Sequence, residues 1–138
     1  MSYNLDIRLE KDTLPVGKLK LCEVRLLNDS RWPWLLLVPM RNEMSEVFDL
    51  VAADQKTLAE ETVIASVALK NITRPEKINT AAIGNIVRQL HVHVIARNEG
   101  DANWPGPVWG FGQAEPYLKS VADKFISQLQ NELGTHVL

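Results

Sequence analysis

Residues 89–95 read Gln-Leu-His-Val-His-Val-Ile, a stretch in which polar and apolar side chains alternate. Successive side chains of a β-strand point to opposite faces, so Gln89, His91 and His93 share one face, and the leucine and valines between them share the other. The pattern predicts a central strand over residues 88–97 whose apolar face packs on helices. Two imidazoles would then stand side by side over a cleft, about 6–7 Å apart along the strand.

The sequence on either side predicts an α+β domain built on an antiparallel sheet. Alternation and turn residues indicate further extended segments at 18–27, with a change of phase near Cys22, at 34–38 and at 75–83. The segments at 18–27 and 34–38 are separated by a short turn sequence and should pair, with the second of them central in the sheet.

Helical spacing of apolar residues indicates three helices that should pack on this sheet. They are a short one at 5–12 ended by Pro15 and Gly17, one in two pieces at 44–70 capped by Ser45 and Asp54, and a C-terminal one running from Pro116 to Gly134. Residues 98–115 contain too many glycines and prolines for an element of their own, so we expect a loop there.

Composition favours a single domain over residues 1–138. With 46% apolar residues the chain can bury a sizeable core. A net charge of -2 provides no overall basic field, which argues against binding to a nucleic-acid polymer but permits a small anionic ligand. Cys22 is the only cysteine and so has no intrachain partner; we expect it to be buried and inert.

The sequence shows neither a secretory signal nor an apolar run of the roughly 20 residues that a membrane span needs. We therefore expect a cytoplasmic protein without a membrane partner.

The histidine pair is compatible with three kinds of site. It could hold a metal, catalyse with one ring as nucleophile or base, or form a satisfied polar patch. A zinc site needs three or four ligands, and no third ligand lies near the pair in sequence, since His136 is almost at the end of the chain. We therefore expect no metal, although a metal-binding protein using His91 and His93 remains an alternative.

Residues 89–95 resemble the motif of the histidine triad (HIT) family, His-x-His-x-His followed by two apolar residues, with Gln89 in place of the first histidine. Asn79 and the pair Gly84-Asn85 precede the motif as an Asn and a Gly-Gln pair do in many members. Residues 36–39, Leu-Leu-Val-Pro, resemble the family's apolar strand that ends in proline. The resemblance covers residues 18–97 and implies a single HIT-like α+β domain with an antiparallel sheet, helices packed on it and a C-terminal helix.

The resemblance also implies a reaction. Members hydrolyse or transfer nucleoside-linked phosphates at anhydride or phosphoramidate bonds, so it implies a small nucleotide substrate, no cofactor and a homodimer. His91 takes the place of the nucleophile that forms a covalent nucleotidyl-histidine, and His93 that of a residue contacting the phosphate or leaving group. The remaining implied site residues are Gln89 as a hydrogen-bonding support, Asn85 at the phosphate, Asn28 at the ribose, and Asn79. Two further nucleotide contacts are expected from position alone, Arg97 at the end of the histidine strand and Trp109 in the loop after it.

Two departures from the family pattern leave alternatives open. Ile86 stands where a Ser or Thr often donates to phosphate, and Trp34 and Gln89 stand where many members have histidines. A non-catalytic nucleotide-binding module is therefore the second hypothesis. Trp32 and Trp34 are expected in the core, whereas Trp104 and Trp109 are expected at a ligand or a dimer partner because they lie in the loop after the histidine strand.

Overall fold

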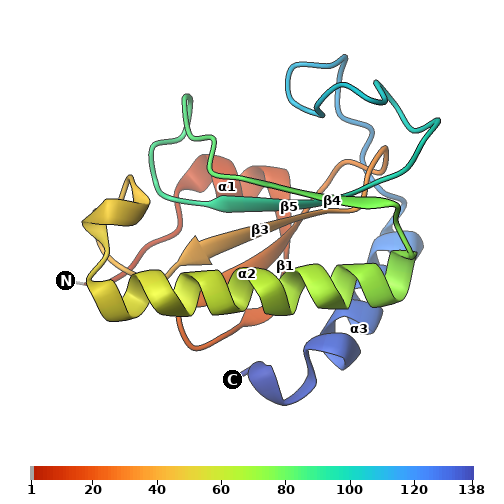
Figure 1. Cartoon of the computed structure of the whole chain (residues 1–138). Coiled ribbons are helices and arrows are strands. Elements are labelled where there is room, and N and C mark those ends of the chain that lie inside the picture. Colours follow the sequence, from red (N-terminus) through yellow and green to blue (C-terminus); the bar gives the residue numbers. More distant parts are fainter. Residues whose placement is uncertain (1) are drawn as a thin grey trace.

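The computed structural model describes residues 2–138 and contains one five-stranded antiparallel sheet with the strand order β1-β2-β3-β5-β4 (Figure 1). The strands are β1 (Thr13–Lys18), β2 (Cys22–Leu27), β3 (Trp34–Pro39), β4 (Lys77–Ala81) and β5 (Val92–Arg97). The helices are α1 (Ile7–Asp12), α2 (Ala52–Thr73) and α3 (Lys119–Leu133), with short 3-10 turns at Val47–Asp49 and Gly134–His136. This arrangement confirms the predicted α+β domain.

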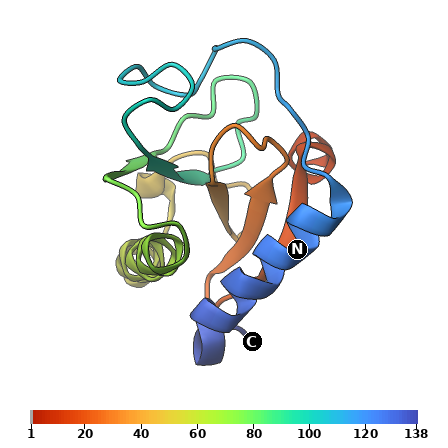
Figure 2. The same cartoon turned by 90° about the vertical axis from the view of Figure 1, so that its right-hand side faces the viewer.

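The two long helices pack on one face of the sheet, as the end-on view of α2 in Figure 2 makes clear. Leu58 and Leu69 of α2 and Phe125 and Leu129 of α3 join the strand residues in one buried cluster. A second cluster lies on the opposite face, where Trp32, Trp34, Leu36 and Ile95 pack with Val108 of the long loop. The sheet is therefore covered on both faces, once by α2 and α3 and once by the long loop together with Leu9 of α1.

Strand β5 lies between β3 and β4, which confirms the predicted central position. Leu90, Val92 and Val94 belong to the cluster under the helices, as the alternation predicted. The hydrogen-bonded strand is shorter than predicted, because it begins at Val92, so His91 lies in the bend just before it.

The predicted strand at 18–27 is two segments rather than one. Residues 19–21 form a turn between β1 and β2, and this turn accounts for the change of phase near Cys22. Strand β1 was missed because Pro15 and Gly17 indicated the end of a helix. An edge strand tolerates both residues, and the register between β1 and β2 shifts between Pro15 and Gly17.

The predicted helix caps Ser45 and Asp54 are wrong. Helix α2 begins after Val51, which makes no side-chain cap bond, and Asp54 is its third residue. A carboxylate there still stabilises the helix N-terminus through its dipole. The 3-10 turn before α2 is capped by Asp49, whose side chain accepts from the backbone N–H of Ser45 (3.1 Å).

The C-terminal helix begins at Lys119 and not at Pro116. The backbone N–H of Tyr117 donates to Asn28 Oδ1 (2.9 Å), and the backbone N–H of Ser30 donates to the Glu115 carbonyl (2.7 Å). These bonds hold the chain extended along the β2–β3 loop until α3 starts.

Among residues 2–138, no helix is both long and apolar enough to cross a membrane.

Glu61 is a buried carboxylate that joins α2 to the β1–β2 turn. It is only 4% exposed, and its two oxygens accept the backbone N–H groups of Leu21 (2.9 Å) and Cys22 (2.8 Å). Burial, followed by the nearby charge of Glu61, raises the pKa of the Cys22 thiol well above its usual value, so this thiol stays protonated and inert.

We expect Glu61→Ala to lower the free energy of unfolding by about 2–4 kcal/mol, because it leaves two buried N–H groups without an acceptor. Glu61→Gln keeps one acceptor oxygen and should cost less. Urea unfolding measures both, with the exposed neighbour Glu60→Ala as the matched control. Equal effects at positions 60 and 61 would contradict the anchoring role.

Candidate active site

His91 is held by a hydrogen bond that determines its tautomer. Its Nδ1 lies 2.7 Å from the backbone carbonyl of Gln89. A carbonyl oxygen can only accept, so in the neutral ring Nδ1 carries the proton and Nε2 carries the lone pair. The ring is 6% exposed and lines a cavity. An imidazole in this state can act as a nucleophile or a base through Nε2.

His93 differs from His91 because both of its ring nitrogens have protein partners. The indole Nε1–H of Trp34 donates to Nδ1 (2.9 Å), and Nε2 lies 3.1 Å from the carbonyl of Ile83. An indole can only donate, so the proton of His93 is on Nε2 and goes to Ile83. Burial lowers the pKa of His93 to about 4, which keeps this ring neutral.

His93 therefore has no nitrogen free for a ligand in this structure, although the resemblance implied a phosphate contact. Instead it connects strand β3, through Trp34, to the segment that carries Ile83 and Gly84. Trp34 reaches it from the diagonal position, since the direct cross-strand partner of His93 is Leu36.

Gln89 points away from His91 and holds the N-terminal segment. Its side-chain oxygen accepts the backbone N–H of Asp6 (2.8 Å), and its side-chain nitrogen donates to the carbonyl of Asn4 (2.9 Å). The backbone carbonyl of Gln89, and not its side chain, is the group that supports His91.

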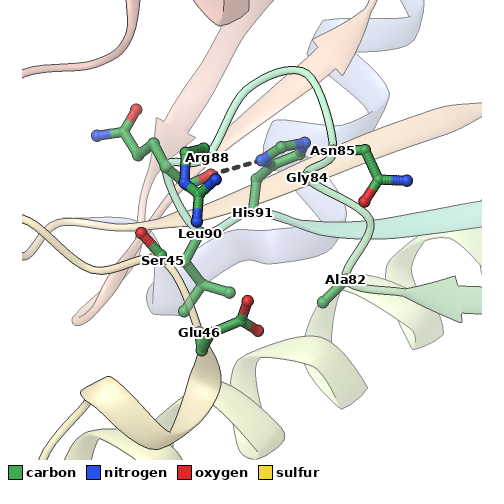
Figure 3. Close-up of a pocket in the computed structure, with 9 residues that line it drawn as sticks. Ser45, Glu46, Ala82, Gly84, Asn85, Arg88, Leu90 and His91 are labelled. Atoms are coloured by element: carbon green, nitrogen blue, oxygen red, sulfur yellow. Dashed lines mark hydrogen bonds between the residues drawn. The ribbon is translucent and has the colours of Figure 1, made fainter.

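A cavity of about 250 Å³ opens beside His91. Figure 3 shows Ser45, Glu46 and Arg88 on one side of it and Gly84 and Asn85 on the other, with the His91 ring between them. An added Cβ at Gly84 would lie 2.7 Å from the carbonyl oxygen of Val87 and 3.7 Å from Cε1 of His91. The approach to the Val87 carbonyl is therefore one that only glycine permits, whereas the distance to the imidazole is an ordinary van der Waals contact.

Two further cavities continue from this one across the loop 98–115. The first, about 290 Å³, shares Gly84, Asn85 and His91 with the cavity above and adds Ile86 and Trp109. The second, about 440 Å³, shares Trp109 and contains Asn28. We call the three together the His91 groove. The structure thus brings His91, Asn85, Asn28 and Trp109 together along one surface, as predicted.

Trp109 stands edge-on to His93, with ring centroids 5.1 Å apart, and edge-on to Trp34 at 6.0 Å. Its Nε1 is buried and has no hydrogen-bond partner among residues 2–138. Trp32 and Trp34 are 1% and 6% exposed, so their predicted core positions are confirmed.

Arg97 was predicted to contact the nucleotide, but the structure places it in the interior. Its guanidinium makes a bidentate pair with Asp101 (2.8 and 2.7 Å) and donates to the Gly106 carbonyl (2.8 Å). It also lies 5.5 Å from the ring centroid of Trp104. With 1% exposure, Arg97 orders the loop and does not line the His91 groove.

Asn79 also lies outside the groove lining. It sits on β4 opposite Ile95 of β5. Three lining residues that the sequence analysis missed are Ser45, Glu46 and Arg31. Arg31 forms a salt bridge with Asp29 (2.8 Å) at the Asn28 end of the groove. Ser45 and Glu46 are separated from the motif by more than forty residues, and no local pattern relates them to it.

Within residues 2–138, no group of three or more His, Cys, Asp or Glu side chains is placed to hold a metal ion. The alternative of a His91/His93 metal site therefore has no third ligand in the part of the chain that the structure describes.

The environment of His93 predicts a pH dependence of stability. Its folded pKa lies below the ordinary value of 6.5, so the stabilising contribution is complete above pH 6.5 and is lost as the pH falls toward 4. We expect a loss of about 2 kcal/mol in the free energy of unfolding between about pH 7 and pH 5. Denaturant unfolding of wild type, His93→Gln and the control His136→Gln measures this. The His93 variant should lose the slope, and a slope shared by all three proteins would contradict the assignment.

The chain resembles known proteins over most of its length. It is 56% identical to a histidine triad (HIT) protein from Sinorhizobium meliloti 1021 of known structure, with a TM-score of 0.93 over 95% of this chain and 97% of that one. A histidine triad protein from Bradyrhizobium japonicum is 44% identical (TM-score 0.95; 97% of this chain and 100% of that one). One from Marinobacter aquaeolei VT8 is 37% identical (TM-score 0.96; 99% and 100%).

A curated relative is the AP-4-A phosphorylase of Mycobacterium tuberculosis, which is 38% identical over 76 residues. The match covers 51% of this chain and 38% of that protein, so it spans less than half of the relative's length. Residues 8–100 match the profile of the family described as HIT domain. Together with the fold and the histidine geometry, this match shows that the chain belongs to the HIT domain family.

Proposed function

We propose that the protein is a nucleotide-phosphate hydrolase or nucleotidyl transferase that acts through a covalent intermediate on His91. The observation that carries this proposal is the hydrogen bond from His91 Nδ1 to the Gln89 carbonyl. In the neutral ring this bond places the lone pair on Nε2, and His91 lines the groove. The family and the partial match to an AP-4-A phosphorylase support a nucleotide-processing enzyme.

The reaction proceeds in two displacements. The lone pair of His91 Nε2 forms a bond to phosphorus, and the bond from phosphorus to the leaving atom breaks, its electron pair remaining on that atom. The imidazole becomes cationic, and its Nδ1–H bond to the Gln89 carbonyl stabilises that charge. A water molecule or another acceptor then attacks phosphorus and releases a proton to solvent. The bond from phosphorus to Nε2 breaks, and its electron pair returns to Nε2 to give the neutral imidazole. Phosphate as the acceptor would make the reaction a phosphorolysis.

Asn85 and the backbone around Gly84 are suited to hold the reacting phosphate. The Asn85 side chain is exposed and makes no hydrogen bond within residues 2–138, so its amide can donate to a phosphate oxygen. Gly84 lets this segment approach His91 closely. Ile86 is 81% exposed and has no hydroxyl. In this proposal the hydrogen bonds to the phosphate therefore come from the Asn85 amide and from backbone N–H groups.

The nucleoside fits the Asn28 end of the groove. Oδ1 of Asn28 accepts from Tyr117, which leaves its amide nitrogen to donate to a ribose hydroxyl. Trp109 lines the passage between Asn28 and His91 and offers an aromatic wall.

We assign His93 a positioning role and not a phosphate contact. Its bonds to Trp34 and Ile83 occupy both nitrogens and hold the segment next to Gly84 in place. Gln89 acts similarly by tying the N-terminal segment to the bend that carries His91.

A second candidate function, nucleotide binding without turnover, is favoured by Ile86 and by the position of the Gln89 side chain away from His91. The two functions differ in one observable. Only the catalytic protein forms a phosphorus adduct on His91.

His91→Ala should abolish turnover and leave the fold and most nucleotide affinity intact, since His91 supplies the nucleophile and belongs to neither hydrophobic cluster, its ring packing against that of His93 (centroids 4.9 Å apart). His91→Gly should be partly rescued by free imidazole, which can enter the vacated space. By contrast, His93→Ala should weaken turnover by about 100-fold without eliminating the covalent route, because it releases the segment beside Gly84 that positions the substrate. Hydrolysis of nucleoside phosphoramidates and dinucleoside polyphosphates measures all three.

The control for these variants is His136→Ala, because His136 is the remaining histidine and is exposed near the C-terminus. Its turnover should equal that of the wild type. Near wild-type hydrolysis by His91→Ala would exclude His91 as the nucleophile, and nucleotide binding with no adduct would favour the non-catalytic alternative.

A homodimer is part of the proposal. Strand β4 is an edge of the sheet and pairs only with β5, and Val63 and Val67 of α2 are 62% and 52% exposed. Both views place α2 and β4 at the same side of the molecule (Figures 1 and 2). An isologous pair of such surfaces would cover both the strand edge and the valines.

We expect sedimentation velocity at micromolar concentration to show a dimer, and Val67→Asp to shift it toward monomer because a charge would be buried at the interface. The matched control is Val121→Asp on α3, where the valine is 49% exposed and lies outside the proposed interface. A wild-type protein that sediments as a monomer would count against the dimer.

A further inference from the structure

The cavity beside His91 contains three polar side chains that are not engaged by the protein. The hydroxyl of Ser45, the amide of Asn85 and the guanidinium of Arg88 line it, and within residues 2–138 none of these groups makes a hydrogen bond or an ion pair. Most of the other arginines differ from Arg88 because their guanidinium groups pair with a carboxylate. Arginines paired with a carboxylate are Arg8, Arg25, Arg31, Arg41 and Arg97.

Arg88 is therefore an available cation at the site of the proposed chemistry. It immediately precedes Gln89, whose carbonyl holds His91, and Figure 3 shows its side chain on the same side of the cavity as Ser45. The nucleoside end of the groove, at Asn28, belongs to a different cavity that Arg88 does not line. Arg88 therefore lies on the side of His91 away from the nucleoside end that the proposed function assigns to Asn28.

We propose that this cavity is the leaving-group site and that Arg88 binds an anionic leaving group there, so that the enzyme prefers nucleotides whose leaving group is a phosphate or polyphosphate. This inference rests on the proposed function, and deepens it by choosing between anhydride and phosphoramidate substrates. A guanidinium offers five donors in a planar fork that matches phosphate oxygens.

The bond changes explain why the charge matters for rate. When Nε2 of His91 binds phosphorus, the phosphorus–oxygen bond to the leaving phosphate breaks and its electron pair remains on that oxygen. The leaving phosphate thus gains a negative charge during the step, and Arg88 stabilises this charge more in the transition state than before it. A leaving amine keeps the electron pair of the phosphorus–nitrogen bond and takes up a proton from solvent as it departs, so it carries no negative charge and Arg88 contributes little to its departure.

Glu46 lines the same cavity and opposes the same ligand. Its carboxylate is exposed and repels a leaving phosphate, so it limits the net attraction that Arg88 provides. Removing the positive charge of Arg88 should therefore slow the cleavage of a substrate with an anionic leaving group, and removing the negative charge of Glu46 should accelerate it. The two variants together test whether the leaving group is anionic.

The experiment compares kcat/KM for diadenosine tetraphosphate and adenosine 5′-phosphoramidate, which transfer the same adenylyl group. Arg88→Ala should lower kcat/KM for the tetraphosphate about 10- to 100-fold, the loss typical of a charged hydrogen-bond partner, and leave that for the phosphoramidate close to wild type. Arg88→Lys should restore part of the loss, and Glu46→Gln should raise kcat/KM for the tetraphosphate alone. Arg74→Ala, which removes an exposed arginine with no ion-pair partner at the end of α2, is the control for net charge.

The outcomes separate this inference from the function on which it rests. Equal losses on both substrates, or no loss on the tetraphosphate, would overturn the role of Arg88 while leaving the His91 mechanism standing. A wild-type protein that cleaves the phosphoramidate and not the tetraphosphate would also overturn the role of Arg88 and leave the His91 mechanism standing. A wild-type protein that forms no His91 adduct with either substrate would overturn the proposed function and this inference together.

Discussion

The segment of strand β5 packs on the main core with one face and carries the histidines on the other, and the rest of the structure depends on this constraint. Leu90, Val92 and Val94 face the helices and belong to the main core, so the strand cannot shift by one residue without burying its polar side chains there. The same register directs His91 and His93 to the opposite side, toward the loop and its tryptophans. The position of the candidate nucleophile is therefore a consequence of core packing.

Buried polar groups then connect segments that are far apart in sequence. Glu61 joins α2 to the β1–β2 turn, Arg97 folds the loop that follows β5, and His93 joins β3 to the segment before the histidines. Each of these groups would destabilise the fold if buried without partners, and each instead has at least two hydrogen bonds. Trp109 Nε1 is the exception that the described residues contain, and it lies in the loop that walls the groove.

The two histidines illustrate how neighbouring residues of one type acquire different roles. His91 has one nitrogen bound by a backbone carbonyl and the other at a cavity, whereas His93 has both nitrogens bound by protein groups. The first arrangement leaves a reactive lone pair, and the second creates a rigid support. The partner of His91 is the backbone two residues before it, whereas the partners of His93 lie on β3 and in the segment before the histidines.

The sequence by itself determined the α+β class, the central strand and the position of His91, because alternation and helical spacing are local patterns that core burial enforces. It also indicated the groove residues Asn28 and Asn85 through the family resemblance, and Trp109 through its place in the loop after the histidine strand. Only the tertiary structure decided that Pro15 lies in an edge strand, that Arg97 and Gln89 serve the fold, and that Ser45, Glu46 and Arg88 share a cavity with His91. These outcomes depend on which residues, distant in sequence, form hydrogen bonds with a given side chain. No local sequence pattern carries that information.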